Sequence, residues 1–492
     1  MGLILSIDQG TTGTTAALID SKSLKLLGKT NKEFPQIYPK PGWVEHNLDD
    51  IWATVASTIT EVITKCDVST TDIVTIGITN QRETICAFDK QGHPLHNAIV
   101  WQDRRTHEFC KSHKESHEAK FKKKTGLPLD PYFSASKMRW LLENSDTVKE
   151  HSAKGDLLFG TIDTFLIYKL THFEAHKTEA SNASRTLLLD INNGAWCDEL
   201  CDFFNVPKET LPSVESSFSL FGKTKGLSFL PDGIPISGVL GDQQAALFGQ
   251  AGLEKGMSKC TYGTGAFYLQ NTGNDIIHSQ NGLLTTIAYR ENGVDYYALE
   301  GSCYIAGAAV QWLRDNLKII NNSGDVEALA KNASDDGMEN ILFLPFFSGL
   351  GSPYWVSDAQ AAIVGLTRDS GNSELARACL EGICLSINDL MESFEKDSGH
   401  KVKELRVDGG AVVNDFLMQL QSNFSETAII RPVVIETTAF GAACAAGIGS
   451  KLFTKEELAN KWQEDKVFNP QNSDYYKRKK NQWNGVIKRL YL

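Results

Sequence analysis

Residues 3–20 decide the fold. They read Leu3-Ile4-Leu5-Ser6-Ile7-Asp8-Gln9-Gly10-Thr11-Thr12-Gly13-Thr14-Thr15-Ala16-Ala17-Leu18-Ile19-Asp20. Two apolar runs around a turn of glycine and threonine are typical of a β-hairpin. Glycines let the backbone come close to a ligand, and the N–H groups and four threonine hydroxyls of this segment would form a concave field of donors. Such a field suits phosphate oxygens, with Asp8 at its rim as a candidate Mg²⁺ ligand.

An ordinary polar hairpin is the alternative interpretation of this stretch. The chain has no Gly-x-x-x-x-Gly-Lys-[Ser/Thr] pattern, so the turn is not a P-loop. Two further turns favour the phosphate interpretation. Thr261-Tyr262-Gly263-Thr264-Gly265-Ala266 lies between two strand-like runs, and Leu405-Arg406-Val407-Asp408-Gly409-Gly410-Ala411 opens a helical pattern. One such hairpin in each half predicts two related α/β domains that face one nucleotide.

Length and composition agree with a two-domain globular protein. A chain of 492 residues exceeds what one core usually fills. The net charge of −11 argues against a nucleic-acid surface, and no apolar run approaches the length of a membrane span. The ten cysteines follow no disulfide or metal spacing, which predicts reduced thiols and a cytoplasmic location.

Several motifs in a fixed order carry a resemblance to a known family. They are Thr79-Asn80-Gln81-Arg82-Glu83-Thr84, Trp101-Gln102-Asp103, Gly241-Asp242-Gln243-Gln244-Ala245-Ala246, Gly301-Ser302 with Ala306-Gly307-Ala308, Gly351-Ser352-Pro353-Tyr354-Trp355 and Val407-Asp408-Gly409-Gly410-Ala411. With the first hairpin, they make the chain resemble the FGGY carbohydrate kinases of the actin-like ATPase superfamily, and among these the glycerol kinases. The resemblance runs from Leu3 to about Gly449.

The resemblance implies two actin-like (ribonuclease H-like) domains with a nucleotide cleft between them. Residues 1–248 would carry the first phosphate hairpin and the glycerol site, and residues 249–492 the second hairpin and the adenosine site. The implied substrates are ATP and glycerol, with Mg²⁺, and the implied assembly is a homodimer or homotetramer. The nucleotide contacts would be Thr11, Thr12, Gly13, Thr264, Gly265, Gly307, Gln311, Gly410 and Asn414, with Asp8 toward the metal.

A kinase for an alcohol needs a carboxylate near the attacking oxygen, and Asp242 is our candidate general base. It follows a strand at the start of a helix, so an N-cap role is the alternative. By the same resemblance, the other alcohol contacts would be Arg82, Glu83, Trp101, Tyr132, Gln243 and Phe267. A kinase for another small polyol or ketose, and an actin-like ATPase without an alcohol substrate, remain open as rival functions.

Overall fold

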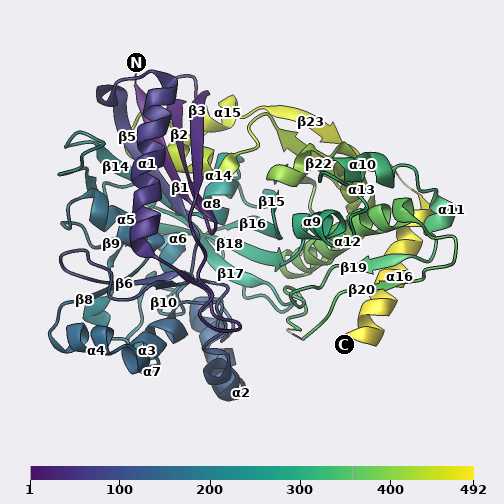
Figure 1. The fold of residues 1–492 in the computed structure, drawn as a ribbon, viewed down its shortest axis with the longest axis horizontal. Coiled ribbons are helices and arrows are strands. Elements are labelled where there is room, and N and C mark those ends of the chain that lie inside the picture. Colours follow the sequence, from purple (N-terminus) through teal and green to yellow (C-terminus); the bar gives the residue numbers. More distant parts are fainter. Residues whose placement is uncertain (1, 357, 472) are drawn as a thin grey trace.

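Two β-sheets with a shared strand plan organise the two halves of the chain (Figure 1). The structure is a computed structural model that describes residues 2–356, 358–471 and 473–492. The first sheet has the order β13-β14-β5-β1-β2-β3. Its strands are β1 (Leu3–Gln9), β2 (Gly13–Asp20), β3 (Leu26–Glu33), β5 (Ile73–Asn80), β13 (Gly222–Lys223) and β14 (Pro235–Gly241).

The second sheet repeats this plan in the order β17-β18-β16-β15-β21-β22-β23. In each sheet a hairpin, β1–β2 or β15–β16, pairs antiparallel, and its first strand pairs parallel with a later strand, β5 or β21. The predicted repetition of an α/β hairpin unit is therefore confirmed. The strands are β15 (Ser258–Tyr262), β16 (Ala266–Gly273), β17 (Leu284–Glu291), β18 (Val294–Cys303), β21 (Glu404–Asp408), β22 (Ala428–Pro432) and β23 (Glu464–Phe468).

The first five residues of strand β1 are apolar except for Ser6, because both faces of the strand are covered. Leu3, Leu5 and Ile7 pack in one cluster with α1 (Leu48–Cys66) and α5 (Ile162–Leu170). Ile4 points to the opposite face, where it packs in a second cluster with α8 (Asp242–Gly249) and α14 (Thr437–Gly449). A strand between two helical layers has a nearly continuous apolar sequence, and in residues 3–7 only Ser6 interrupts it.

Helix α14 belongs to the last part of the chain, yet it lies on β14, β5 and β1 of the first sheet. It also packs against α8 at backbone distance. A Cβ added at Gly441 would lie 1.8 Å from the Ala245 carbonyl oxygen, and one added at Gly249 would lie 2.3 Å from the Thr437 carbonyl oxygen. The small residues of α14 thus allow the close packing of the two helices.

Replacing Gly441 by alanine should destabilise the protein, because two helices in backbone contact would have to separate. Overpacking of this kind costs about 1–3 kcal/mol. Gly485→Ala is the matched control, since a Cβ there meets no atom within 4 Å and Gly485 also lies in a helix. That control should gain roughly 1 kcal/mol. Urea unfolding measures both, and equal stabilisation by the two substitutions would contradict the contact.

The remaining elements surround the two sheets. In the first half these are β4 (Glu45–His46), β6 (Ile85–Asp89), β7 (Ala98–Ile99), β8 (Leu157–Thr161), α2 (His107–Thr125), α3 (Ala135–Asn144), α4 (Asp146–Ala153), β9 (Lys177–Glu179), α6 (Ala180–Ala183), β10 (Leu189–Asp190), β11 (Ala195–Trp196), α7 (Asp198–Phe203) and β12 (Ser213–Glu215). In the second half they are α9 (Gly307–Asp315), α10 (Asp325–Ala330), α11 (Asp335–Met338), β19 (Leu342–Leu344), β20 (Ala362–Val364), α12 (Asn372–Ser398), α13 (Asp415–Ser425), α15 (Lys455–Lys461) and α16 (Asp474–Leu490).

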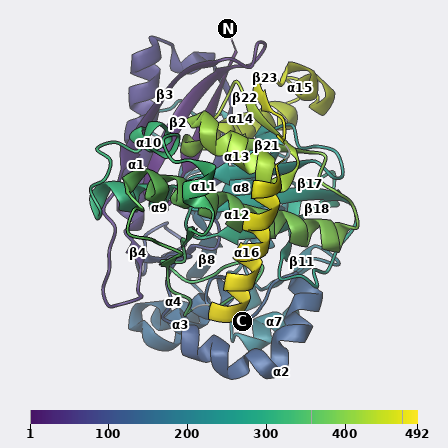
Figure 2. The same cartoon turned by 90° about the vertical axis from the view of Figure 1, so that its right-hand side faces the viewer.

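The C-terminal segment is more than a polar surface tail. Strand β23 extends the second sheet, and α16 lies across the second half (Figure 2). Trp483 of α16 is buried, and its indole N–H donates to Asp389 Oδ2 of α12 at 2.7 Å. With Val486 and Ile487, Trp483 joins the apolar core of the second half. Among the described helices, none combines the length and the apolarity that crossing a membrane would require.

Candidate active site between the two halves

The turn between β1 and β2 is closed by its own backbone. The Gly10 N–H donates to the Gly13 carbonyl at 2.9 Å. Thr12 is exposed at the tip of the turn, and the Thr11 hydroxyl accepts a hydrogen bond from the Trp101 indole at 3.0 Å. The predicted phosphate turn and one predicted wall of the alcohol pocket therefore lie next to each other.

Two of the four threonines do not belong to this turn, which corrects the expected field of four hydroxyls. Thr14 turns inward and shares a 2.8 Å hydrogen bond with Thr54 of α1, and Thr15 accepts from Asn31 at 2.9 Å. Close packing alone explains why residue 13 is a glycine, because a Cβ there would lie 2.8 Å from the Lys32 carbonyl oxygen on β3. Period-two alternation in β2 sends Thr14 into the core.

Asp8 stands near the end of β1 with its carboxyl facing other carboxylates. Burial raises its pKa to about 7, and the negative charges of Asp242 and Glu436 act in the same direction. Within the described residues, no hydrogen bond or ion pair to this carboxyl is present. A carboxylate that is buried and repelled by a second carboxylate suits a hard cation such as Mg²⁺, so the donor set fits the predicted metal.

Asp242 is the first residue of α8 and lies beside Arg82. Its Oδ1 is 2.9 Å from Arg82 Nε and accepts the Gln243 N–H at 2.7 Å. The residue before it, Gly241, occupies the N-cap position, and no side chain caps the helix there. The side chain is 30% exposed, in contrast to its arginine partner at 2%. The N-cap alternative therefore does not describe Asp242, whose carboxylate is both oriented and accessible.

Arg82 belongs to a buried network of alternating charges. Its guanidinium forms a bidentate pair with Glu300 of β18 at 2.6 and 2.8 Å. Arg185 bridges Glu300 at 3.2 Å and Glu83 at 2.6 Å. Burial opposes the charge of Glu300, but the two arginines prevail and lower its pKa to about 2. The sequence predicted Arg82 and Glu83 but missed Arg185 and Glu300, because nothing local marks them as partners.

Glu83 adopts a left-handed backbone conformation with φ of 61°. A non-glycine residue in this region costs roughly 1–3 kcal/mol and is enriched at functional sites. Burial raises its pKa, against the opposing effect of Arg185. The strained backbone aims the carboxylate of Glu83 toward the arginine network, which supports a specific role for this side chain.

The other residues predicted for the alcohol pocket make contacts of their own. Trp101 and Tyr132 meet edge to face with ring centroids 5.5 Å apart. Gln243 accepts a hydrogen bond from Lys259 of β15 at 2.5 Å, a buried lysine that the sequence did not single out. Phe267 lies on β16 opposite Thr261 and Ser302, and is partly exposed.

The second hairpin carries the start of α9. The Ala306 N–H donates to the Thr264 carbonyl at 2.8 Å, and the Gly307 N–H donates to the Gly263 carbonyl at 2.9 Å. A Cβ at Gly307 would lie 2.6 Å from the Gly263 oxygen, and one at Gly265 would lie 2.6 Å from the Cys303 oxygen. Both glycines are thus required where the turn and the helix start meet.

Gly410 and Asn414 approach the same hairpin from β21. The preceding Gly409 has φ of 90° and lies against the Tyr262 backbone, at the end of β15. A Cβ added at Gly410 would meet no atom within 4 Å. The Asn414 side chain caps α13 by accepting the Leu417 N–H at 2.9 Å. Gln311 is exposed, one helical turn beyond Gly307 on α9. Of the nucleotide contacts predicted in the second half, Gly307 contacts the hairpin turn directly, and Gly410 follows a residue that lies against Tyr262.

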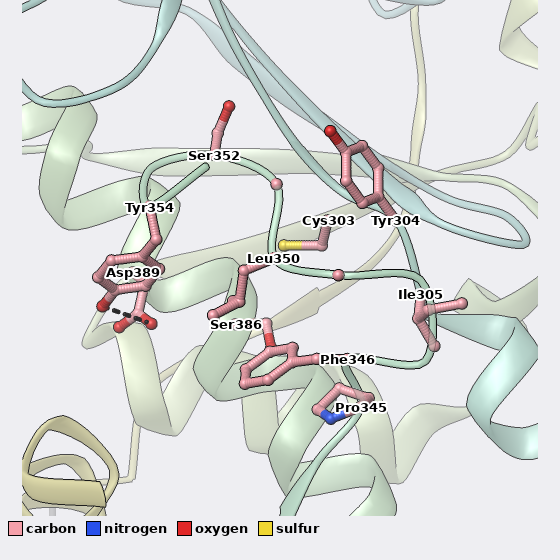
Figure 3. Close-up of a pocket in the computed structure, with 12 residues that line it drawn as sticks. Cys303, Tyr304, Ile305, Pro345, Phe346, Leu350, Ser352, Tyr354, Ser386 and Asp389 are labelled. Carbon is pink, nitrogen blue, oxygen red and sulfur yellow. Dashed lines mark hydrogen bonds between the residues drawn. The ribbon is translucent and has the colours of Figure 1, made fainter. Parts of the chain in front are cut away.

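The motif Gly351-Ser352-Pro353-Tyr354-Trp355 lies on a loop beside a small cavity (Figure 3). Tyr304, Tyr354 and Asp389 line the cavity, and the Tyr354 hydroxyl donates to Asp389 at 3.1 Å. None of the predicted site residues lines it. Trp355 reaches out of the loop and packs against the core of the first half. This motif therefore supports the contact between the halves.

Replacing Asp389 by asparagine should make stability less dependent on pH between about 4 and 7. Burial raises the pKa of Asp389 to about 7, although Trp483 and Tyr354 donate hydrogen bonds to it. The folded state therefore holds this proton more tightly than the unfolded chain, so its contribution is complete at low pH and is lost as pH rises toward 7. Urea unfolding across this range, with exposed Asp336→Asn as control, measures the slope. A wild-type slope in Asp389→Asn would contradict the assignment.

Comparison with known proteins identifies the family. The sequence model of the FGGY family of carbohydrate kinases, N-terminal domain, matches residues 3–249, and that of the C-terminal domain matches residues 258–450. The chain belongs to the FGGY family of carbohydrate kinases. Curated FGGY relatives include the glycerol kinase of Rhizobium meliloti, 50% identical over 100% of this chain and 99% of the relative. That of Staphylococcus haemolyticus is 49% identical over 96% of this chain and 94% of the relative.

Solved structures of two other kinases share the architecture. Plasmodium falciparum glycerol kinase with ADP has a TM-score of 0.91 at 37% identity, covering 100% of this chain and 99% of that one. Gluconate kinase from Lactobacillus acidophilus, at 23% identity, shows the same fold with a TM-score of 0.88 over 99% of this chain and 98% of that one. The predicted two-domain actin-like fold is confirmed.

Proposed function

We propose that this FGGY kinase transfers the γ-phosphoryl group of ATP to glycerol and yields sn-glycerol 3-phosphate. The observation that carries the proposal is the accessible Asp242 carboxylate, held at 2.9 Å by Arg82 and facing Asp8 beside the first hairpin. The relatives named glycerol kinase, at 46–50% identity over nearly the whole chain, support glycerol as the alcohol.

In this proposal Asp242 orients the attacking hydroxyl and accepts its proton as the bond to phosphorus forms. The transition state of phosphoryl transfer is loose, so positioning and charge neutralisation matter more than covalent help. Thr11 and Thr12 of one hairpin, with Thr264 and Gly265 of the other, would hold the phosphates. Asp8 would hold Mg²⁺, which neutralises phosphate charge when bound.

The alcohol would lie among Arg82, Glu83, Tyr132 and Gln243. A triol presents three hydroxyls that both donate and accept, and a pocket for it must pair each of them. Arginine and glutamate offer both kinds of partner, while the rings of Trp101 and Phe267 would limit the size of the pocket. Gly307, Gln311, Gly410 and Asn414 would line the adenosine side.

A panel of polyols and ketoses with ATP tests the proposal. Glycerol should give the highest kcat/KM for ADP release, and stereospecific glycerol 3-phosphate dehydrogenase should consume the product. Faster turnover with a ketose would identify the rival sugar kinase. ATP hydrolysis that no alcohol stimulates would instead indicate an actin-like ATPase.

We further propose a cytoplasmic location and a homodimeric or homotetrameric assembly. The location is supported by ten cysteines that all carry free thiols, as expected where disulfides are kept reduced. The assembly rests on the family resemblance alone. Sedimentation velocity of the purified chain would distinguish a monomer from either oligomer.

A further inference from the structure

Two side chains at the start of α3 hydrogen-bond to the backbone of three residues predicted for the alcohol pocket. The Ser134 hydroxyl donates to the Glu83 carbonyl oxygen at 2.8 Å. Two residues into the helix, Lys137 Nζ donates to the carbonyl oxygens of Tyr132 at 3.0 Å and Trp101 at 3.4 Å. All three bonds are made to backbone carbonyl oxygens. They fix the position of the backbone of each residue and leave its side chain free to contact a substrate.

Lys137 is fully buried, which is unusual for a lysine. Burial lowers its pKa to about 7, while Asp103 and Glu83 favour the charged form. An apolar residue of the same length would avoid this desolvation cost but could not donate to two carbonyl oxygens. The buried amine therefore links two segments of the chain by donating to the carbonyl oxygens of Trp101 and Tyr132, which are 31 residues apart.

The two residues held by Lys137 contact each other, and one of them contacts the first hairpin. The Trp101 indole also donates to Thr11 of the first hairpin, and its ring meets that of Tyr132 edge to face. Arg185 lies near the Tyr132 ring, with its guanidinium carbon 5.8 Å from the ring centroid. A shift of either carbonyl would move a ring of the wall and change the size of the pocket.

We propose that Lys137 is a positioning residue for the alcohol pocket, which holds the Trp101 and Tyr132 carbonyl oxygens so that both rings fit a three-carbon triol. This inference rests on the proposed function. Lys137 acts through Trp101 and Tyr132 and does not touch the reacting atoms. Lys137 reaches the first hairpin only through Trp101, and the second hairpin, where the adenosine would bind, has no hydrogen bond to Lys137 among the described residues. ATP affinity should therefore change far less than glycerol affinity.

The test is Lys137→Met, which keeps an unbranched side chain of similar bulk, one atom shorter than lysine, and removes the donor. We expect the KM for glycerol to rise roughly ten- to a hundredfold, because a displacement of about 1 Å in a site is costly. The KM for ATP should stay near that of the wild type, and discrimination between glycerol and the four-carbon erythritol should fall. Lys479→Met is the matched control, since Lys479 is also buried and donates to a main-chain carbonyl, that of Ile341, far from the site.

Lys137→Gln provides a second measurement should the methionine variant not fold. Glutamine retains an N–H donor but is one atom shorter, so it cannot reach both carbonyl oxygens, and the glycerol KM should again rise. Wild-type glycerol KM and wild-type discrimination in a folded variant would overturn the inference. Absence of glycerol-dependent ADP release in the wild type would instead overturn the proposed function, so the two failures are distinguishable.

Discussion

Asp242→Asn should lower the turnover number by roughly 10²- to 10⁴-fold, the range expected when a general base is removed. Asparagine keeps the size of the side chain and one oxygen near Arg82 Nε, which the wild-type carboxylate approaches at 2.9 Å. It cannot accept the proton of the attacking hydroxyl. Nucleotide affinity, measured by calorimetry with ADP, should change little, because the predicted adenosine contacts lie around the other hairpin.

Asp198→Asn is the matched control for this experiment. Asp198 is also the first residue of a short helix, α7, and is 78% exposed in an ion pair with Lys208. Its replacement should leave turnover unchanged. If Asp242→Asn kept turnover within a factor of about three of the wild type, the carboxylate would only orient the hydroxyl and another group would take the proton.

Arg82→Ala should weaken both glycerol use and the fold. The guanidinium is 2% exposed, and its loss leaves Glu300 and Asp242 without their nearest cation. Removing one partner of a buried ion pair costs about 3–5 kcal/mol. Each charge-assisted hydrogen bond lost to glycerol would cost a further 1.5–3 kcal/mol or so of binding, about ten- to a hundredfold in KM. Steady-state kinetics and urea unfolding together measure the two effects.

Arg377→Ala separates stability from substrate binding. Arg377 is also nearly buried and pairs with Glu381 and Asp335 on the far side of the second half. It should lose comparable stability and keep the wild-type KM for glycerol. If Arg82→Ala instead lost ATP affinity and kept glycerol affinity, the alcohol pocket would lie elsewhere.

Local patterns allowed the hairpins to be predicted. The runs around residues 3–20 and 258–269 contain both strands and the turn, so neighbouring residues determine the structure. Gly307 and Gly410 were predicted as nucleotide contacts from the family resemblance, and that role stays a prediction. The shared order of the motifs then placed both hairpins in one family of folds.

The charge network could not be predicted in this way. Arg82 and Glu300 are 218 residues apart, and Glu83 and Arg185 are 102 apart, so only the folded chain brings them together. Arg185 and Lys137 also look like ordinary surface cations in the sequence, because charged residues are rarely buried without partners. Their partners are a distant carboxylate in one case and main-chain carbonyl oxygens in the other, which side-chain patterns do not reveal.

The position of α14 has a consequence for the order in which the chain becomes structured during synthesis. The first sheet is complete once residues 3–241 have left the ribosome, but residues 437–449 cover one of its faces. Until almost the whole polypeptide has emerged, Ile4, Ala17 and Leu240 lack their neighbours from α14. Exposed apolar surface on nascent chains invites aggregation. We therefore expect the amino-terminal half to keep an uncovered apolar face for longest, although it is made first.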